Sequence, residues 1–495
     1  MTSWELSILF PIILVGTLGV LFFVVFKEKI KKNSWLFLLE TFAFWIATSF
    51  VGYQVANQFS EIQSSVSKTQ LIIIILFSSS LFTIFLKPLA TFFTGLIRSR
   101  KTWLWISYTI LFIQNILLIF MTPSVVTSII NALMYAILLS TSTIHFLYFN
   151  EQFYYRINTL PVTWIIFTLI GSGSIFGLFI FDIQTIVFNV DNLFVTNIIL
   201  ALVAIGCIVL NIFKKEIKNL AGVFDSNIIE QLPKKNNINF LVIYFLTFLL
   251  VLSYSMLDSN LVKQFLQIKL ISKGYNQDFI NSFLNLNQIL SLSIGTMSGY
   301  LIYKYVLKYF GQKYLFIINL FILFTLYATL SFVTNPFIVI VINILVVIAY
   351  NQLLYTLFSF CMFWNYRSPK NPVTGFFGSA LFGAQYLSSS ADNLFNNSQN
   401  SFVQNIHSII AGEITDLTII QEHSDQFRDI ITIIFAIASL LVLVALLVYY
   451  FTSNKIIADF VNYRLAMQNL KTILKKRMIE KTKTQIDVEN LDANE

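Results

Sequence analysis

Long apolar blocks, separated by short polar segments, occupy most of the chain. A membrane-spanning helix needs about 20 mostly apolar residues, and thirteen blocks approach or exceed that length. The predicted spans are 6–26, 35–55, 70–92, 103–121, 125–149, 161–181, 193–213, 239–258, 279–303, 313–333, 336–364, 373–390 and 430–452. The block at 373–390 is the weakest, because it is short and contains glycine. This pattern predicts an all-α, polytopic membrane protein with about 13 spans.

The composition excludes a water-soluble protein. Of the 495 residues, 57% are apolar and only 11% are charged, whereas roughly a quarter of the residues in soluble globular proteins are charged. So few charges cannot cover the core of a soluble domain of this length. The net charge of +8 is spread between the apolar blocks, which favours the lipid bilayer over nucleic acid as the partner.

The sequence lacks the common patterns of catalysis and metal binding. A G-x-x-x-x-G-K-S/T phosphate loop, a histidine pair at metal spacing and a G-x-S-x-G turn are all absent from it. Cys207 and Cys361 both lie inside apolar blocks, where neither a disulfide framework nor a zinc site is expected. We therefore expect a protein that is not an enzyme, with no catalytic residue, no metal and no cofactor.

The placement of lysine and arginine predicts the orientation in the membrane. With segment 27–34 in the cytoplasm, 26 of the 32 basic residues fall on the cytoplasmic side, five fall on the far side, and Lys87 lies inside a helix. Cytoplasmic loops of membrane proteins carry this kind of excess. The sequence therefore predicts a multi-pass protein of the plasma membrane, with its N-terminus outside and its C-terminus in the cytoplasm.

The spans divide into one extra helix and two sets of six. Segment 1–34 holds the extra N-terminal span and a basic turn, and the two six-helix halves occupy 35–213 and 239–452. The polar segment 214–238 joins the halves as a cytoplasmic linker. Transporters are often built from two such repeats. The predicted fold is therefore a 12-helix, two-half transporter-like bundle with one additional N-terminal helix.

Two basic turns at corresponding places in the halves resemble a motif of the major facilitator superfamily. That family carries G-x-x-x-D-R-x-G-R-R/K between its second and third helices, and a degenerate copy between its eighth and ninth. Here Arg98–Lys101 and Gly311–Lys313 stand where the two copies end. The Asp position of the first copy is Leu96, so the latch that this Asp forms in the family is not expected. The resemblance implies a secondary transporter whose gating turns include Arg98, Arg100, Lys101 and Lys313.

Glycine is scarce, and four glycines form two G-x-x-x-G pairs. Gly173 and Gly177 lie in the fifth helix of the two-half bundle, and Gly295 and Gly299 lie in the eighth. This spacing puts both glycines of a pair on one helix face and allows close approach of another backbone. The fifth and eighth helices pack together in the resembled fold, so we expect these pairs at the sliding surface between the halves. Ordinary helix packing elsewhere is the alternative.

Glu40, Lys87 and His145 are the ionisable side chains within predicted spans that could carry chemistry. Glu40 is the only carboxylate well inside a core span, and a buried carboxylate is a candidate for proton coupling. Its interfacial position near Trp35 supports the alternative of a structural role. Lys87 is expected to extend its ammonium to the headgroups, and a lone helical histidine such as His145 is more often hydrogen-bonded locally than a ligand.

The other polar groups within the spans are amides and phenols. The first, fourth, seventh and tenth helices line the central cavity of the resembled fold. The cavity candidates are Asn131, Tyr135, His145, Tyr244, Tyr254, Gln288, Tyr350, Asn351 and Gln385. Amides and phenols suit uncharged solutes such as sugars or nucleosides, whereas phosphates and carboxylates require inward-facing Arg or Lys. Hydrogen bonding between helices is the alternative role for each of them.

Two further segments are additional to the twelve helices of a simple transporter. The extracellular insertion 391–429 is rich in Asn and holds a short amphipathic stretch, and the tail 453–495 has apolar residues at helical spacing opposite basic ones. These segments and the extra helix are candidate contacts for a protein partner, and the tail also suits anionic lipid. Two hypotheses follow: a transporter of a small uncharged solute, or a transport-silent scaffold subunit of a larger membrane complex.

Overall fold

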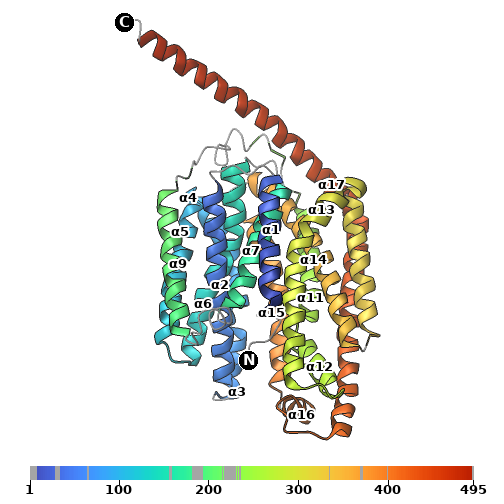
Figure 1. Ribbon diagram of the computed structural model, residues 1–495. Coiled ribbons are helices and arrows are strands. Elements are labelled where there is room, and N and C mark those ends of the chain that lie inside the picture. The colour runs from blue at the N-terminus through green and yellow to red at the C-terminus, as the bar shows by residue number, and fades with distance from the viewer. Residues whose placement is uncertain are drawn as a thin grey trace.

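The protein is a bundle of long, roughly parallel helices in the computed structural model (Figure 1). The described residues are 8–27, 34–63, 66–154, 159–180, 193–214, 216, 230, 232–233, 236–333, 335–367, 372–398 and 400–492. Within these ranges the secondary structure is helical and contains no strand, which confirms the predicted all-α class for this part of the chain.

The N-terminal part contains an extra helix followed by the first half. The extra helix is α1 (Phe10–Lys27). The first half comprises α2 (Trp35–Gln63), α3 (Lys68–Leu76), α4 (Ser79–Ile97), α5 (Lys101–Phe120), α6 (Val125–Phe149), a π-helical turn (Asn150–Tyr154), α7 (Thr159–Leu178) and α9 (Leu193–Phe213).

The second half follows the linker. It comprises α11 (Asn237–Leu257), α12 (Asn260–Ile271), α13 (Gln277–Leu330), α14 (Pro336–Arg367), α15 (Val373–Asn396), α16 (Ser401–Ile410) and α17 (Leu417–Asp492). We name the face from which the end of α17 projects the tail face, and the opposite face, which carries α16, the α16 face (Figure 1).

Length and apolar composition agree with a membrane protein. Among the described residues, nine helices are long and apolar enough to cross a membrane, and Pro11–Lys27 and Val162–Leu178 are shorter apolar helices. The nine are Trp35–Phe59, Lys68–Ile97, Lys101–Phe120, Val125–Phe153, Leu193–Phe213, Asn237–Ile271, Gly311–Leu330, Pro336–Asn365 and Leu417–Asn462. The predicted blocks 279–303 and 373–390 are helical but are not among them. The count of thirteen spans therefore stays a prediction.

Two helix breaks have clear local causes. The block predicted as one span at 70–92 is divided into α3 and α4, because Phe77 and Ser78 leave helical geometry. Within α13, Gly311 has a φ of 71°, which glycine adopts at little steric cost. Gly311 therefore ends one predicted span and begins the next, as the sequence pattern indicated.

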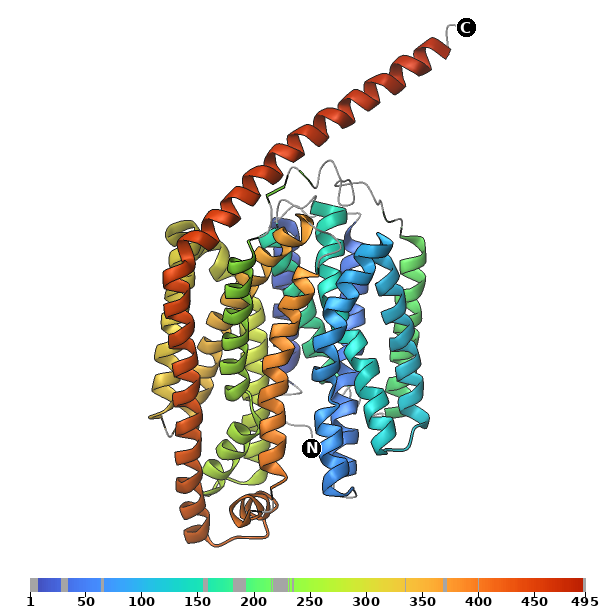
Figure 2. The same ribbon diagram turned by 180° about the vertical axis from the view of Figure 1, so that it is seen from behind.

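The two halves form separate helix groups that meet along two seams. Within the first half α2 packs on α7, α4 on α6 and α5 on α9, and within the second α11 packs on α15 and α17, and α13 on α14. The halves meet where α4 contacts α15 and where α7 contacts α13 and α14. Both views show the first half and the second half side by side (Figures 1 and 2).

Helix α1 lies across the seam formed by α7 and α13, and it contacts both helices. Ile13 on α1 belongs to a small apolar cluster with Ile175 and Phe179 of the first half and Ile289 of the second. The extra helix predicted from the sequence is therefore an added element that touches both halves.

The predicted boundaries at the C-terminal end differ from the structure. The insertion predicted at 391–429 includes the end of α15, all of α16 and the start of α17. Helix α16 is amphipathic as expected, since Val403, Ile406 and Ile409 are buried. The tail predicted to begin at 453 is no separate element: α17 runs through this position without a break and projects obliquely from the bundle (Figures 1 and 2). The backbone hydrogen bonds of the helix continue without interruption from the predicted span 430–452 into the predicted tail.

Candidate functional site

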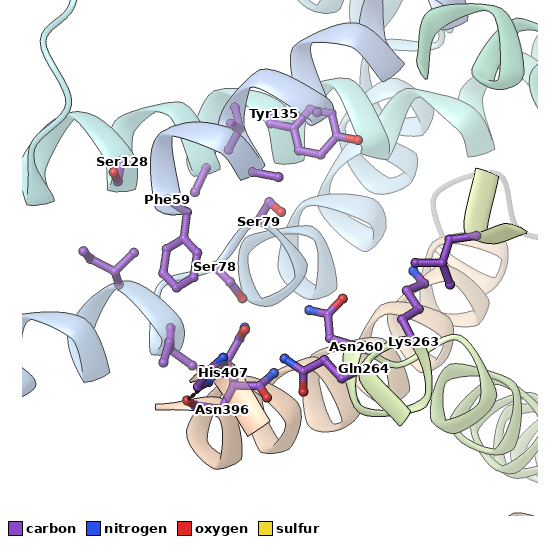
Figure 3. A pocket seen from close by; sticks show the side chains of 18 of the residues that line it. Phe59, Ser78, Ser79, Ser128, Tyr135, Asn260, Lys263, Gln264, Asn396 and His407 are labelled. Atoms are coloured by element: carbon purple, nitrogen blue, oxygen red, sulfur yellow. Dashed lines mark hydrogen bonds between the residues drawn. The ribbon is translucent and has the colours of Figure 1, made fainter. Parts of the chain in front are cut away.

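A cavity of about 770 Å³ lies between the two halves near the α16 face (Figure 3). From the first half it is lined by α2, α3, α4 and α6, and from the second by α12, α13, α15 and α16. Because both halves contribute side chains, any movement of one half against the other changes the shape of this space.

The cavity lining is rich in neutral hydrogen-bonding groups. Its amides are Asn260, Gln264, Gln267, Asn393 and Asn396, and its hydroxyls are Ser78, Ser79, Ser128 and Tyr135. Among the described residues that line the cavity, Lys263 is the one Lys or Arg, and its Nζ lies 3.4 Å from the Asp258 carboxylate. The lining therefore suits an uncharged polar solute better than a multiply charged anion.

Tyr135 projects into this space because Gly52 leaves room for its ring. A Cβ atom at Gly52 would lie 2.6 Å from Tyr135 Cζ, closer than atoms approach without displacement. Both residues line the cavity. Because residue 52 of α2 has no side chain, the Tyr135 ring of α6 can lie directly against the α2 backbone.

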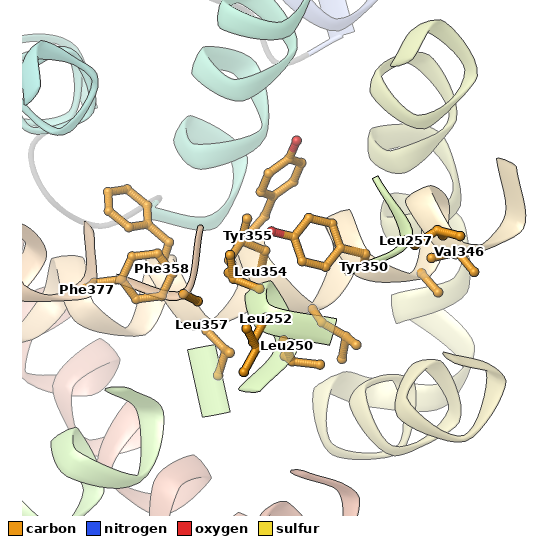
Figure 4. Packing of buried hydrophobic residues seen from close by; sticks show 14 of the residues in the cluster. Leu250, Leu252, Leu257, Val346, Tyr350, Leu354, Tyr355, Leu357, Phe358 and Phe377 are labelled. Carbon is orange, nitrogen blue, oxygen red and sulfur yellow. The ribbon is translucent and has the colours of Figure 1, made fainter. Parts of the chain in front are cut away.

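Aromatic side chains pack the halves together on the tail side of the cavity. Trp164 and Phe167 on α7 contact Tyr355 on α14, with ring centroids 4.4 and 3.8 Å apart. Phe146 on α6 lies 4.7 Å from Phe358 on α14. We call these five residues the aromatic closure. Figure 4 shows Tyr355 and Phe358 within the buried apolar packing of α11, α14 and α15.

Of the predicted cavity residues, Tyr135 lines the cavity and the others do not. Tyr254 and Tyr350 stack on each other inside the second half, 4.2 Å between centroids. The Asn131 side chain is buried and donates a 2.8 Å hydrogen bond to Gln58 Oε1. The remaining candidates, outside the lining of this cavity, are His145, Tyr244, Gln288, Asn351 and Gln385.

The prediction missed the polar residues of α12 and α16. Gln264, Gln267 and His407 lie in segments that the hydrophobic pattern assigns to loops between spans, yet both segments form helices that line the cavity. Their density of Asn and Gln was a visible signal. A pattern of apolar blocks singles out polar residues inside the blocks, and these amides lie between them.

Glu40 forms a buried ion pair within the first half. Its Oε2 lies 2.5 Å from Lys214 Nζ, and Tyr108 donates a 2.5 Å hydrogen bond to its Oε1. The Lys214 ammonium also lies 4.7 Å from the centre of the Phe37 ring. Glu40 is absent from the cavity lining, so this geometry favours a structural carboxylate that ties α2 to the end of α9.

His145 extends the same network towards the core of the first half. Trp45 Nε1 donates to His145 Nδ1 at 3.3 Å, so the other ring nitrogen carries the hydrogen of the neutral imidazole. That nitrogen, Nε2, lies 3.3 Å from the Tyr108 oxygen, which accepts the bond while its own hydrogen is donated to Glu40. His145 is therefore locally hydrogen-bonded, which agrees with the alternative raised for it above.

The first basic turn is held inside its own half. Arg100 is buried and its guanidinium makes two bonds, of 3.2 and 3.3 Å, to the Glu151 carboxylate in the π-helical turn after α6. Glu216, at the start of the linker, accepts from Ser99 Oγ at 2.5 Å and from the Arg100 backbone N–H at 2.8 Å. Lys101 Nζ donates to backbone oxygens of Ile212 and Lys214 at 3.2 and 2.6 Å.

The other predicted gating residues also have local surroundings. Arg98 is exposed and ends α4 in the left-handed conformation, with a φ of 59°. Lys313 donates a 2.7 Å hydrogen bond to Asn454 of α17, within the second half. These contacts of the turns thus stabilise each half, and a role in gating between the halves stays a prediction.

Gly173, Gly177 and Gly295 face helices of their own half, which corrects the expectation for these three predicted interface glycines. A Cβ atom at Gly173 would lie 2.9 Å from Phe42 O, and one at Gly177 would lie 2.8 Å from Ser49 Cβ, both on α2. A Cβ atom at Gly295 would overlap the Val347 side chain and lie 3.2 Å from Asn351 Nδ2, both on α14. The surroundings of Gly299 lie outside the described side chains. The G-x-x-x-G spacing shows where a backbone approaches closely, but not which helix supplies it.

The close approach between the halves is made by α15 instead. A Cβ atom at Gly375 would lie 2.6 Å from Pro88 Cα on α4. Ser379 donates a 2.6 Å hydrogen bond to Ile84 O on the same helix. Lys87 lies in this contact and is buried, so the expected extension of its ammonium to the headgroups is wrong: α15 covers it on one side and α6 on the other.

Comparison with known proteins supports the fold. No protein-family model matches the chain, and no curated protein matches its sequence. Among solved structures, a crystal structure of a mutant of the nucleoside transporter NupG is similar, with a TM-score of 0.51 and 12% sequence identity. The match covers 81% of this chain and 99% of that one. At this identity the similarity concerns the arrangement of the helices.

Proposed function

We propose that the protein is a secondary transporter of the major facilitator type, which moves a small, uncharged polar solute by alternating access. The observation that carries this proposal is the cavity between the halves, together with the aromatic closure on its tail side. A space lined by both halves and closed at one end is the geometry that rocking of the halves needs.

The cavity lining narrows the substrate class. Asn260, Gln264 and Gln267 offer both donors and acceptors, whereas the lysine of the lining, Lys263, lies beside Asp258. A solute with several hydroxyl or amide groups and no net charge fits this lining. Nucleosides are the first solutes to test, because the similar structure is that of a nucleoside transporter, and sugars are the second.

The distribution of basic residues supports one orientation for this carrier. The tail face carries the basic turns and the start of the linker. Cytoplasmic segments of membrane proteins carry an excess of Lys and Arg, so this face is assigned to the cytoplasm. The α16 face is then on the outside of the plasma membrane. Because the cavity lies near this face, the structure represents an outward-facing state of the transporter. Protease accessibility of α16 and of the end of α17 in sealed vesicles tests this assignment.

Uptake into proteoliposomes tests the function. We expect radiolabelled nucleosides or sugars to enter faster than into protein-free liposomes, and Gln264→Leu to slow this uptake by about fivefold, since loss of one hydrogen bond to substrate costs about 1 kcal/mol. The matched control is Gln426→Leu, which removes an exposed amide of α17 outside the cavity lining. Folded, monodisperse protein that transports neither class of solute argues against the proposal.

A second candidate function rests on the length of α17. This helix extends well beyond the bundle at the tail face (Figure 2), where it offers a surface to another protein of a larger membrane assembly. As a transport-silent scaffold, the protein would be extracted from its native membrane with a stoichiometric partner. Extraction in mild detergent that yields a monodisperse monomer alone would reject this alternative.

A further inference from the structure

Lys87 is a buried lysine in the contact between the halves. It is the ninth of the 19 residues of α4, and its exposure is 5%. Two other basic side chains withdrawn from solvent each have a carboxylate partner: Arg100 has Glu151 and Lys214 has Glu40. Within the described part of the chain, no carboxylate forms an ion pair with Lys87.

The groups that face Lys87 are hydroxyls and a ring. Its Nζ lies 2.5 Å from Ser142 Oγ and 3.5 Å from Thr143 Oγ1 on α6, and 5.0 Å from the centre of the Phe382 ring on α15. Ser142 donates its own hydrogen to Leu139 O, so it accepts from Lys87. A neutral amine can also donate this bond to the hydroxyl, so the bond does not require a charged lysine.

The neighbouring ionisable groups on the packed helices point elsewhere. His145, on α6, is bonded to Trp45 and lies beside Tyr108. Tyr386, one turn after Phe382 on α15, donates to Leu76 O. Lys87 is therefore surrounded by neutral groups, and withdrawing an ammonium from water without an anion is costly.

The position of Lys87 ties it to the movement of the halves. The glycines of α15 cover it: a Cβ atom at Gly375 would lie 2.7 Å from Lys87 O, and one at Gly378 would overlap the Lys87 side chain. Ser79 and Tyr135, on the same two helices α4 and α6, line the cavity. Any separation of α4 from α15 therefore brings water to Lys87.

We propose that Lys87 is a proton-dependent switch, whose protonation shifts the two halves towards the arrangement in which α4 and α15 are apart. This inference rests on the proposed function and names the residue whose proton biases alternating access. Lys87 releases its proton to water as α15 closes over it, and takes a proton from water when α4 and α15 separate. Low pH thus favours the arrangement in which the two helices are apart, by thermodynamic linkage.

A distance measurement across the α16 face tests the proposal without a solute. Spin labels at Lys68→Cys on α3 and Lys273→Cys after α12 occupy exposed positions in the two halves, while the native Cys207 and Cys361 are buried. As pH falls from 9 to 5, we expect a second, shorter distance to become populated as the α16 face closes. One proton limits the population change to about tenfold per pH unit.

Three variants complete the design. Lys87→Met has no charge, and we expect it to keep the longer distance at every pH. Lys87→Arg is always charged, and we expect it to favour the shorter distance at every pH. Lys455→Met removes an exposed lysine of α17 and should respond to pH as the wild type does; Lys87→Gln replaces the Met variant if that one unfolds.

Two outcomes would overturn the proposal: distances of the wild type that do not change with pH, or an unchanged pH response in Lys87→Met. Neither outcome depends on solute uptake. A bundle that responds to pH through Lys87 but transports no tested solute rejects the proposed substrate class and retains Lys87 as a proton-dependent switch. If a solute is taken up but the distances do not respond to pH, the proposed function is retained and the role of Lys87 is rejected.

Discussion

The ring of Phe167 on α7 stacks on the ring of Tyr355 on α14, with 3.8 Å between their centroids and 18° between their planes. This contact joins the two halves on the tail side of the cavity. Aromatic pairs contribute about 0.5–1.5 kcal/mol beyond the area they bury. The Phe167–Tyr355 pair is thus a specific stabiliser of the arrangement described here.

Loss of this stacking should loosen the aromatic closure. We expect Phe167→Ala to raise the rate at which a maleimide labels Cys361 on α14 by about fivefold, which corresponds to about 1 kcal/mol. The thiol of Cys207, buried in the first half, is an internal control and should keep its rate. Phe321→Ala removes an exposed ring of α13, and equal labelling in both variants would contradict the assigned role.

The contact of α15 with α4 should tolerate no side chain at position 375. A Cβ atom there meets the Pro88 backbone at 2.6 Å, so we expect Gly375→Ala to destabilise the protein by about 1–3 kcal/mol, as overpacking does. Thermal unfolding in detergent measures this change. Gly206→Ala on α9 is the matched control, because nothing lies within 4 Å of its added Cβ atom; a similar loss in both variants would argue against a close helix contact.

The buried pair of Arg100 and Glu151 should be costly to break. Glu151→Ala leaves the guanidinium buried without its carboxylate, and such a loss costs about 3–5 kcal/mol. The exposed pair of Arg428 and Asp429 provides the comparison, and Asp429→Ala should cost less than about 1 kcal/mol. Chemical denaturation of each variant gives both values, and equal values would show that the turn is not held through this pair.

Asp392 should support α12 and hence the cavity. Its carboxylate accepts the backbone N–H groups of Asn260 at 2.8 Å and Leu261 at 3.2 Å, at the start of α12. Asp392→Ala leaves these donors without their acceptor, so we expect a loss of about 1–2 kcal/mol in stability. Uptake should fall too, since α12 carries Gln264 and Gln267.

The exposed Asp416, which accepts from the Thr418 backbone N–H near the start of α17, is the control for this variant. Water replaces its carboxylate as the acceptor after Asp416→Ala, so that change should have a smaller effect. If both variants lose the same stability, the bond from α15 to α12 contributes nothing specific.

Helix positions were predictable from the chain because they depend on local properties. The block at 193–213 coincides with α9, and the break at Gly311 falls between two predicted spans. A continuous apolar stretch satisfies its backbone hydrogen bonds as a helix wherever it lies. The same reasoning identified the extra N-terminal helix and the amphipathic α16, because neither depends on distant residues.

Side-chain partners depend on how each helix is rotated and crossed against the others, and no single block of sequence contains that information. The spacing of Gly173 and Gly177 correctly predicted a close helix contact. The partner helix, however, is α2 of the same half and not a helix of the other half. Lys87 was expected near the headgroups and is enclosed by α6 and α15. The apolar pattern therefore specified which segments become helices. Packing of the folded chain placed Lys87 in the contact between the halves, and Tyr135 and the amides of α12 in the cavity lining.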